Sequence, residues 1–508
     1  MPIRVSGLNS GLDTDSIVKE LVSAYRTKGD KLKKQQTKLS WTQDKWKSLN
    51  AKVLNLYKSL DSLRFSSGFN MKKTTVSDST KALVTASKDS VNGTQKLNVI
   101  QTATGGYLTG EELNDTNGGK TKVSELRPDL LSPPGTGSLN GTFTIGSGSN
   151  TQQITVDENT TIDDFVKQIN DAKVGVKASY DAANHRIFIA STSTGAANDF
   201  TLTPTANTDG EKILDAFGVT TGSGAHKEDA KNAIIKLNGA TFESETNKFN
   251  INGMAIEALS ETGDKSENAV TISTATDTQG LYDKIKDFIS EYNSIINEMS
   301  SLYNADSAKG YEPLTSEEKE SLSESEIADW EKKVKDSLLR RDDNLSTLIN
   351  TMTSAMSKTY EINGKKYSLA SLGIKTASYF TTTAANRYEL HIDGDADDDT
   401  TSANADVLMS MLNSDPDAVI GIIQGAATDL YDNLGKQMKT STLRSFQSIY
   451  NDKAMAQSYS DYTKKISAWE EKVTAMEESY YKKFAAMETA LAKLQSQQSA
   501  FAGMLGGS

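Results

Sequence analysis

Apolar residues recur at heptad spacing near the beginning of the chain. They occupy two positions of each heptad, with Thr42 as the one gap, and the set is Leu39, Trp46, Leu49, Val53, Leu56, Leu60 and Leu63. A repeat of this kind predicts a helix that packs along one side against another helix.

A shorter amphipathic pattern precedes this repeat. Asp13 or Thr14 can cap a helix there, and Gly29 should weaken it. The apolar positions of this helix are Ile17, Val18, Leu21, Val22 and Tyr25. A basic run follows, consisting of Arg26, Lys28, Lys31, Lys33, Lys34 and Lys38. Residues 1–38 and the glycine-containing last residues are expected to be disordered until they pack.

The other end of the chain carries a matching heptad pattern. One position repeats through Ile466, Val473, Tyr480, Met487, Leu494 and Phe501, and a second contains Trp469, Met476, Phe484 and Leu491. A buried Leu or Val stabilises by about 1.5–3 kcal/mol, so each stripe needs a partner, and we expect the two terminal stripes to pack on each other. The basic run should then pair with Glu470, Glu471, Glu477, Glu478 and Glu488.

A third apolar stripe, between Leu281 and Leu302, is expected to return alongside residues 39–63 and form a helical bundle. Between residues 72 and 275 the pattern changes to period two, which is typical of half-buried strands. Asn252-Gly253 predicts a hairpin turn. One short helix, capped by Thr160 or Thr161, interrupts the strands.

These patterns predict an α+β fold with a helical coiled-coil leg and a helical-bundle body built from both termini, and two inserted β-rich domains. The loop 114–141, rich in Gly, Pro and Thr, should separate the two β-rich domains. The expected domains are a leg segment at 1–40, partly disordered; a body at 41–71 and 277–464; an inner β-rich domain at 72–135 and 232–276; an outer one at 136–231; and a leg helix at 465–508.

Composition excludes several classes of function. The 508 residues contain 55 Lys and Arg against 67 Asp and Glu, a net charge of −12, which argues against a nucleic-acid partner. No residue is cysteine, which removes disulfides, thiolate metal sites and cysteine nucleophiles, and the three histidines lie far apart in sequence. No run of 18 apolar residues exists, and residues 1–8 lack the apolar core of a secretory signal, so we expect neither membrane insertion nor the general secretory route.

Catalytic and ligand-binding motifs are incomplete. Gly119-Lys120-Thr121 resembles the end of a phosphate loop, but Asn114 stands where the first glycine is required. The acidic turn that begins at Asp393 has Asp398 and Asn404 in place of the glycine and glutamate of a calcium loop. We therefore expect no enzyme activity, metal or cofactor, and we interpret the acidic run 317–331 as an exposed helix or connector.

The terminal motifs resemble a known family. Val5-Ser6-Gly7-Leu8-Asn9-Ser10-Gly11-Leu12-Asp13-Thr14-Asp15-Ser16-Ile17-Val18 is similar to the start of the bacterial flagellar filament cap, the flagellar hook-associated protein type 2 family. The similarity continues in 39–63, in Leu372-Gly373-Ile374 and in the closing helix 462–494. Residues 161–180, with 186–190, resemble a helix-plus-strand motif shared by flagellin and hook proteins. Residues 304–336 look like an addition found in only part of the family.

The resemblance implies a homo-oligomeric plate of about five or six subunits at the extracellular filament tip. Its legs would insert among flagellin subunits and promote their folding without catalysis. It also implies export through the flagellar type III system without a cleaved signal peptide. The implied partners are flagellin, the hook-filament junction protein and an export chaperone, with host mucin as a further candidate. The interaction surface would lie on the leg and body helices, at Ile17, Leu21, Leu39, Trp46, Leu49, Val53, Leu56, Leu60, Ile466, Trp469, Val473, Met476, Tyr480, Phe484, Met487, Leu491 and Leu494.

Two alternatives stay open at this point. Another axial flagellar protein, such as the hook-filament junction protein or flagellin, would also pair its terminal helices. A surface adhesin or polysaccharide-processing enzyme could use the β-rich domains, with the helices as a spacer. For Trp41 and Trp46 we favour packing in the body over direct contact with a partner.

Overall fold

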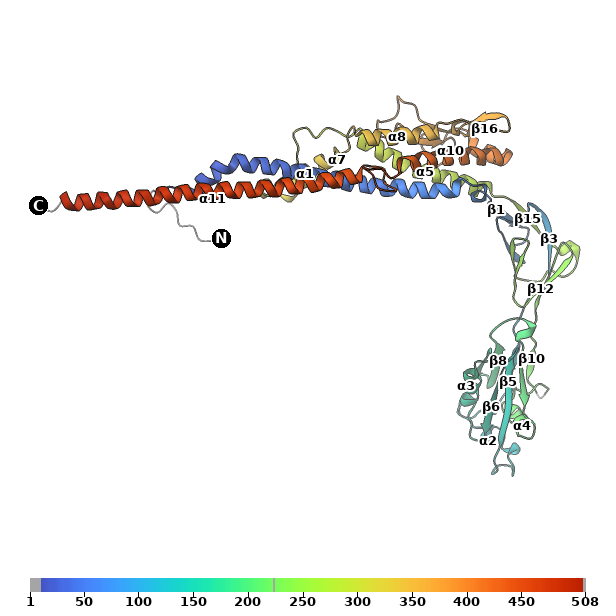
Figure 1. Ribbon diagram of the computed structural model, residues 1–508. Helices are drawn as coiled ribbons and strands as arrows, with labels where there is room; N and C mark the ends of the chain where they lie inside the picture. The colour runs from blue at the N-terminus through green and yellow to red at the C-terminus, as the bar shows by residue number, and fades with distance from the viewer. Residues whose placement is uncertain (1–10, 223, 506–508) are drawn as a thin grey trace. The chain divides into compact units, whose positions relative to one another are not determined.

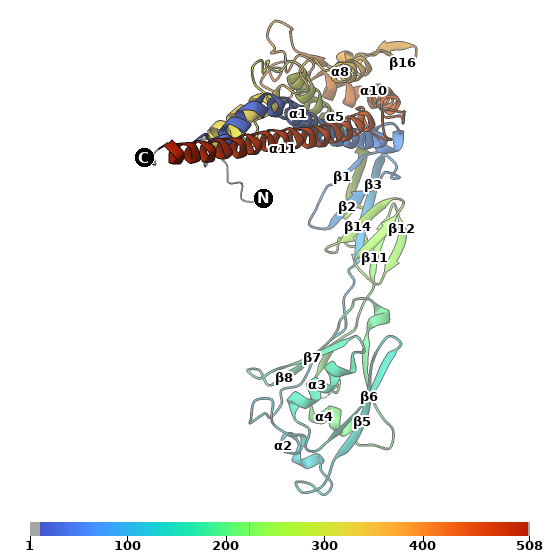
Figure 2. The same cartoon turned by 60° about the vertical axis from the view of Figure 1, so that its left-hand side comes forward.

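The computed structural model describes residues 11–222 and 224–505, and the chain forms two compact units (Figures 1 and 2). Both ends of the chain, up to Phe69 and from Thr278, build a helical unit, and Asn70–Asp277 builds a β-rich unit. The expected α+β fold class is therefore confirmed. Predictions that concern residues 1–10 and 506–508, including residues 5–10 of the Val5–Val18 motif, fall outside the described residues.

The helical unit contains two long helices, α1 (Thr14–Leu63) and α11 (Asp452–Leu505), which run side by side (Figure 1). Its remaining helices are α5 (Thr278–Tyr303), α6 (Ser316–Glu320), α7 (Glu324–Asp336), α8 (Asp343–Met356), α9 (Val407–Ser414) and α10 (Pro416–Gln437). Two small hairpins complete it, β16 (Tyr360–Ile362) with β17 (Lys365–Tyr367) and β18 (Ile374–Thr376) with β19 (Leu390–Ile392).

Helix α1 begins where the sequence predicts. The Asp13 carboxylate accepts a hydrogen bond from the Ser16 amide at 3.1 Å, as an N-cap does. The helix then continues for 50 residues through Gly29 without a break. Residues 14–38, which are expected to be disordered until they pack, are helical and are packed against α11. Packing against α11 overrides the low helix propensity of glycine.

The carboxyl-terminal half of α1 belongs to the helical body. Leu49, Val53, Leu56 and Leu60 are fully buried, and Trp46 is 1% exposed. This half of α1 runs antiparallel to α5, with Lys52 Nζ 2.6 Å from a Glu298 carboxylate oxygen. It also contacts α10. The third apolar stripe, on α5, is buried as predicted.

The β-rich unit contains two separate hydrophobic cores. The first lies between a five-stranded sheet, ordered β1-β15-β3-β11-β12, and a three-stranded sheet, ordered β13-β14-β2. Their bounds are β1 Lys72–Val76, β2 Ala82–Ala86, β3 Gly93–Gln101, β11 Ala233–Leu237, β12 Ala240–Ser244, β13 Lys248–Ile251, β14 Met254–Ala258 and β15 Val270–Thr276. The predicted hairpin is confirmed, since Phe249 pairs with Ile256 and both Asn252 and Gly253 have positive φ, as this tight turn requires.

The second core lies between the sheets β10-β4-β8-β7 and β6-β5-β9 and three short helices (Figure 2). Their bounds are β4 Tyr107–Thr109, α2 Val123–Leu126, β5 Asn140–Ser147, β6 Asn150–Asp157, α3 Ile162–Ala172, β7 Val176–Asp181, β8 Arg186–Ser191, β9 Phe200–Pro204, α4 Gly210–Ala216 and β10 His226–Glu228. Thr161 caps α3, as expected.

Two expectations for the β-rich unit need correction. The sequence predicts one helix, but α2 and α4 accompany α3. It also places residues up to 135 in the inner domain, whereas Leu108, Val123 and Leu131 are buried in the second core. The reason is that β4 pairs with β8 and β10. The chain therefore enters the second core at Tyr107–Thr109, before the loop 114–141 that the sequence predicts as the boundary between the two domains.

Candidate interaction surface

The amino-terminal half of α1 and the middle of α11 form an antiparallel helix pair. Along one flank Arg26 pairs with Glu477, and seven residues later Lys33 pairs with Glu470 at 2.7 Å. We call these contacts the ion-pair ladder. Its two members confirm the predicted pairing of the basic run for Glu470 and Glu477. Within the described residues Glu471 and Glu478 form no ion pair, and Lys34 of the basic run pairs with Glu318.

Trp469 lies at the centre of this pair. Its indole Nε1 donates a hydrogen bond to the Tyr25 carbonyl at 2.7 Å, and the two rings stack at 6.3 Å between centroids. Lys28 Nζ lies 4.5 Å from the centre of the same indole. A Cβ at Gly29 would stand 3.2 Å from Trp469 Cδ1, so glycine lets the indole approach the α1 backbone closely.

The residues assigned from the sequence divide into three groups by burial in the single chain. The buried ones are Trp46, Leu49, Val53, Leu56, Leu60 and Ile466. The half-buried ones are Ile17, Leu39, Trp469, Val473, Met476, Tyr480 and Phe484. The exposed ones are Leu21, Met487, Leu491 and Leu494.

Within the single chain, contacts between the helices differ from the expected arrangement in two places. Val18 and Val22 are buried, whereas Leu21 is 43% exposed, because the face of α1 toward α11 runs through Val18, Val22 and Gly29. The terminal stripes also do not pack on each other in full. The 39–63 stripe is covered mainly by the helical body, and α11 instead pairs with the part of α1 before residue 40.

The last part of α11 continues beyond α1 (Figure 1). Because Arg26 lies opposite Glu477, the start of α1 at Thr14 is level with residue 489, near where contact with α1 ends. The apolar side chains of this part are Met487, Leu491, Leu494 and Phe501, which are 37%, 37%, 61% and 68% exposed. We call them the exposed stripe.

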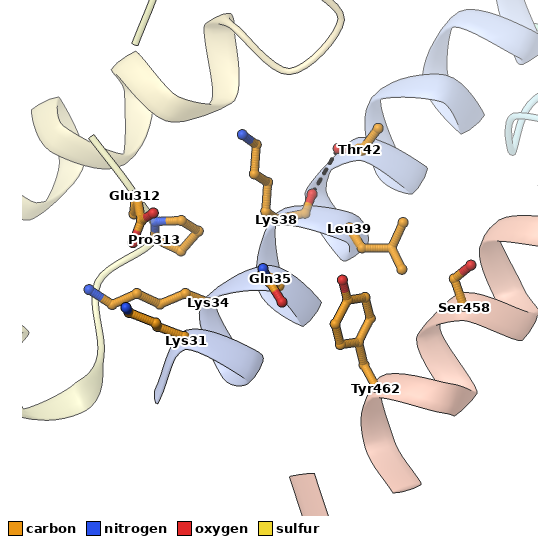
Figure 3. A pocket seen from close by; sticks show the side chains of 10 residues that line it. All are labelled: Lys31, Lys34, Gln35, Lys38, Leu39, Thr42, Glu312, Pro313, Ser458 and Tyr462. Atoms are coloured by element: carbon orange, nitrogen blue, oxygen red, sulfur yellow. Dashed lines mark hydrogen bonds between the residues drawn. The ribbon is translucent and has the colours of Figure 1, made fainter. Parts of the chain in front are cut away.

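A groove runs along α1 beside its contact with α11 (Figure 3). It has a volume of about 710 Å³ and lies between the segment Glu312–Pro313 and the α11 residues Ser458 and Tyr462. Lys31, Lys34 and Lys38 line it. Lys34 contacts Glu318 at 2.7 Å, while within the described residues Lys31 and Lys38 form no ion pair or side-chain hydrogen bond.

The segment 304–336 packs against α1 through polar contacts. In addition to the Lys34–Glu318 pair, Lys335 Nζ lies 4.5 Å from the centre of the Trp41 ring. The two carboxylate oxygens of Glu331 form ion pairs with Lys319 Nζ at 2.6 Å and with Lys335 Nζ at 2.9 Å. Val334 is buried. Trp41 therefore packs within the helical unit, and the acidic run 317–331 forms the short helices α6 and α7 with their connector.

The acidic turn after β19 is neutralised by side chains of the same unit. Lys286 lies 2.6 Å from both Asp395 and Asp397, and Lys375 lies 2.7 Å from Asp393. Burial alone would raise the pKa of Asp393, but hydrogen bonds from Lys375 and Asn404 lower it below its usual value. Among residues 11–222 and 224–505 no cluster of His, Asp and Glu is arranged to bind a metal ion, and no helix is long and apolar enough to span a membrane.

Three protein-family models match the chain. Residues 10–105 match the flagellar hook-associated protein 2 N-terminus, and residues 230–496 match the flagellar hook-associated protein 2 C-terminus. Residues 142–193 match the flagellin hook IN motif, which includes the helix-plus-strand segment that resembled flagellin and hook proteins.

Individual proteins are similar over most of the chain. The flagellar hook-associated protein 2 of Halalkalibacterium halodurans is 28% identical over 465 residues, which are 87% of this chain and 83% of that protein. The protein of the same name from Escherichia coli K12 is 23% identical and covers 97% of this chain and 96% of its own length. A crystal structure of the D1-D2-D3 domains of the Escherichia coli flagellar cap protein FliD aligns with a TM-score of 0.49 at 21% identity, covering 79% of this chain and 97% of that one.

Proposed function

Because the chain belongs to the flagellar hook-associated protein 2 family, we propose that it is a filament cap: several copies form a plate at the tip of the flagellar filament and promote the folding and insertion of exported flagellin. The role is structural and involves no catalysis. The protein therefore acts outside the cell, at the end of a filament. This function is favoured over an adhesin or an enzyme because the matched family models cover both ends of the chain and most of its helical unit.

One structural observation carries the proposal, namely the helix pair of α1 and α11 with its incomplete burial. The exposed stripe continues the heptad repeat of α11 past the start of α1. Apolar side chains at helical spacing are stabilised when a second helix covers them. A flagellin lattice made of paired terminal helices would supply such partners, so we assign this helix pair to the leg of the cap.

The finer features of the proposal rest on membership of the family. The body is the remainder of the helical unit, and the two β-rich cores are the inner and outer domains. The ring contains about five or six subunits. The chain is exported through the flagellar type III system with a chaperone that holds α11 before assembly, and the cap adjoins the hook-filament junction protein before the first flagellin is inserted. A host ligand such as mucin would bind the β-rich unit.

The test replaces Met487, Leu491 and Leu494 together by glutamine, in cells that lack the natural protein. Glutamine keeps the helix propensity and removes the apolar contact. Short or absent filaments in electron micrographs, with flagellin released as monomer into the medium, are the expected result.

The matched control places glutamine at Ala485, Thr489 and Ser496, exposed positions in the same part of α11 and on the side of the helix opposite the exposed stripe. Filaments of normal length from the control show that polar substitution in α11 is tolerated. Normal filament growth in cells that produce the stripe variant at parental levels would contradict the assignment of α11 to the leg. Failure of the purified parent chain to form a ring would contradict the cap itself.

A further inference from the structure

The helix pair has two charged faces that the single chain leaves unpaired. On α1 these charges are Lys31 and Lys38, which are seven residues apart, exposed, and line the groove of Figure 3. On α11 they are Glu471 and Glu478, also seven residues apart and exposed. None of the four forms an ion pair or side-chain hydrogen bond within the described residues.

Both faces point away from the contact between α1 and α11. At 3.6 residues per turn, Lys31 and Lys38 lie on the side of α1 roughly opposite Val22 and Gly29, which are buried against α11. By the same geometry Glu471 and Glu478 lie roughly opposite Val473 and Tyr480, which are half-buried toward α1. These lysines and glutamates therefore do not meet within one helix pair.

We propose that the α1 groove of one copy receives the Glu471–Glu478 face of α11 from a neighbouring copy, so that leg pairs associate side by side. This inference rests on the proposed ring of subunits and assigns a contact within it. The ion-pair ladder shows that the required spacing works, because Arg26 and Lys33 are also seven residues apart and meet Glu477 and Glu470. Seven residues span about 10.5 Å on either helix, so the two faces match in length.

The surroundings of the charges favour this occupant. Ser467, Ala468, Thr474 and Ala475 flank the two glutamates and are exposed, so short side chains let a neighbouring helix approach. In the groove Leu39 and Tyr462 provide an apolar side, while Lys34 is already engaged by Glu318. Glu312 at the edge is the one acidic lining residue, which leaves an excess of positive charge for the incoming carboxylates.

The contact joins two different surfaces, and such a heterologous contact closes into a ring when the rotation between copies is a whole fraction of a turn. When all leg pairs point the same way, α1 of one copy runs antiparallel to α11 of the next. This orientation places Lys31 opposite Glu478 and Lys38 opposite Glu471. The interface therefore has the same antiparallel order and seven-residue spacing as the ladder inside each copy, with a register shifted by six residues, or about 9 Å.

Charge reversal tests the contact by sedimentation velocity. The purified full chain with Lys31→Glu and Lys38→Glu should associate about tenfold more weakly, because two attractions become two repulsions at a solvent-exposed site. The chain with Glu471→Lys and Glu478→Lys should weaken to a similar extent. An equimolar mixture of the two variants should associate more tightly than either variant alone, because each charge faces its opposite wherever the two variants alternate. Parental association should be recovered in full when the ring contains an even number of subunits.

The matched control carries Lys47→Glu and Lys58→Glu, which change the net charge equally at exposed positions on the same helix. It should associate like the parent, and hydrogen exchange in residues 14–38 should be unchanged in every variant. Parental association of both charge variants, or a mixture no tighter than either variant alone, would overturn the contact. If the parent forms rings and the variants do so too, only this inference fails, whereas a parent that remains monomeric overturns both the ring and the contact.

Discussion

Removal of the Trp469 side chain should open the α1–α11 pair while leaving the helical body folded. The indole stacks on Tyr25, donates a hydrogen bond to its carbonyl and packs on Gly29, whereas the core of the body is formed by other residues. A tryptophan buries about 150–250 Å², and for a half-buried ring at about 25 cal/mol per Å² this contributes about 2.5 kcal/mol. Loss of the hydrogen bond of this half-exposed group adds about 0.5 kcal/mol, so Trp469→Ala should weaken the pair by about 3 kcal/mol.

Native-state hydrogen exchange measures this change directly. An opening free energy lower by about 3 kcal/mol accelerates exchange about 100-fold, since each 1.36 kcal/mol is a factor of about ten. The acceleration should cover the amides of residues 14–38 and 462–484, and amides near Leu56 should keep their parental rates. The matched control is Leu494→Ala, in the exposed stripe, which should leave both regions unchanged. Parental exchange rates in 14–38 after Trp469→Ala would refute the conclusion that this residue holds the pair together.

Three further predictions concern single residues. Gly29→Val adds branched methyl groups where a Cβ is already 3.2 Å from Trp469 Cδ1, so the same exchange measurement should show the pair weakened by about 1–3 kcal/mol. Trp46→Ala should lower the unfolding free energy of the helical body by about 3–5 kcal/mol in urea denaturation, because the ring is almost fully buried; a loss below about 1 kcal/mol would contradict this packing. Lys375 and other hydrogen bonds lower the pKa of Asp393 despite its burial, so the stability that its carboxylate provides is present above its unfolded pKa of about 3.9 and is lost as the pH falls through its folded pKa. Asp393→Asn should therefore flatten the loss of thermal stability below about pH 4, and an unchanged acid profile would count against this role.

The regular parts of the fold could be predicted because their signals are local. Heptad repeats identify the long helices, and Asn252-Gly253 between alternating apolar residues identifies a hairpin that the register confirms. The fold class follows from the order of these elements along the chain.

The partner of each helix face could not be predicted in the same way. Periodicity indicates that Leu49 and Leu56 are buried, but it does not distinguish α11 from the helices of the body, and the body covers them. For the same reason the interaction surface predicted from the sequence includes Leu21 and omits Val22. Because both residues are apolar and adjacent, the sequence does not determine which of them faces the partner helix. Helix propensity likewise marks Gly29 as a weak point, although its contact with Trp469 requires a residue without a side chain.

The two halves of α1 are held by different kinds of contact, and this difference links the fold to the proposed function. In the body, Val53 and Leu60 are fully buried, whereas the leg pair combines half-buried apolar residues with exposed ion pairs such as Lys33–Glu470. Exposed ion pairs contribute little, typically below about 1 kcal/mol each, so the leg pair should open at a lower free energy than the body. The exposed stripe and the unpaired charges lie on the same leg, and residues 11–222 and 224–505 leave both surfaces uncovered. The leg pair is therefore only marginally stable in the single chain, and neighbouring subunits would stabilise it by covering these surfaces. Folding of this region is then coupled to assembly.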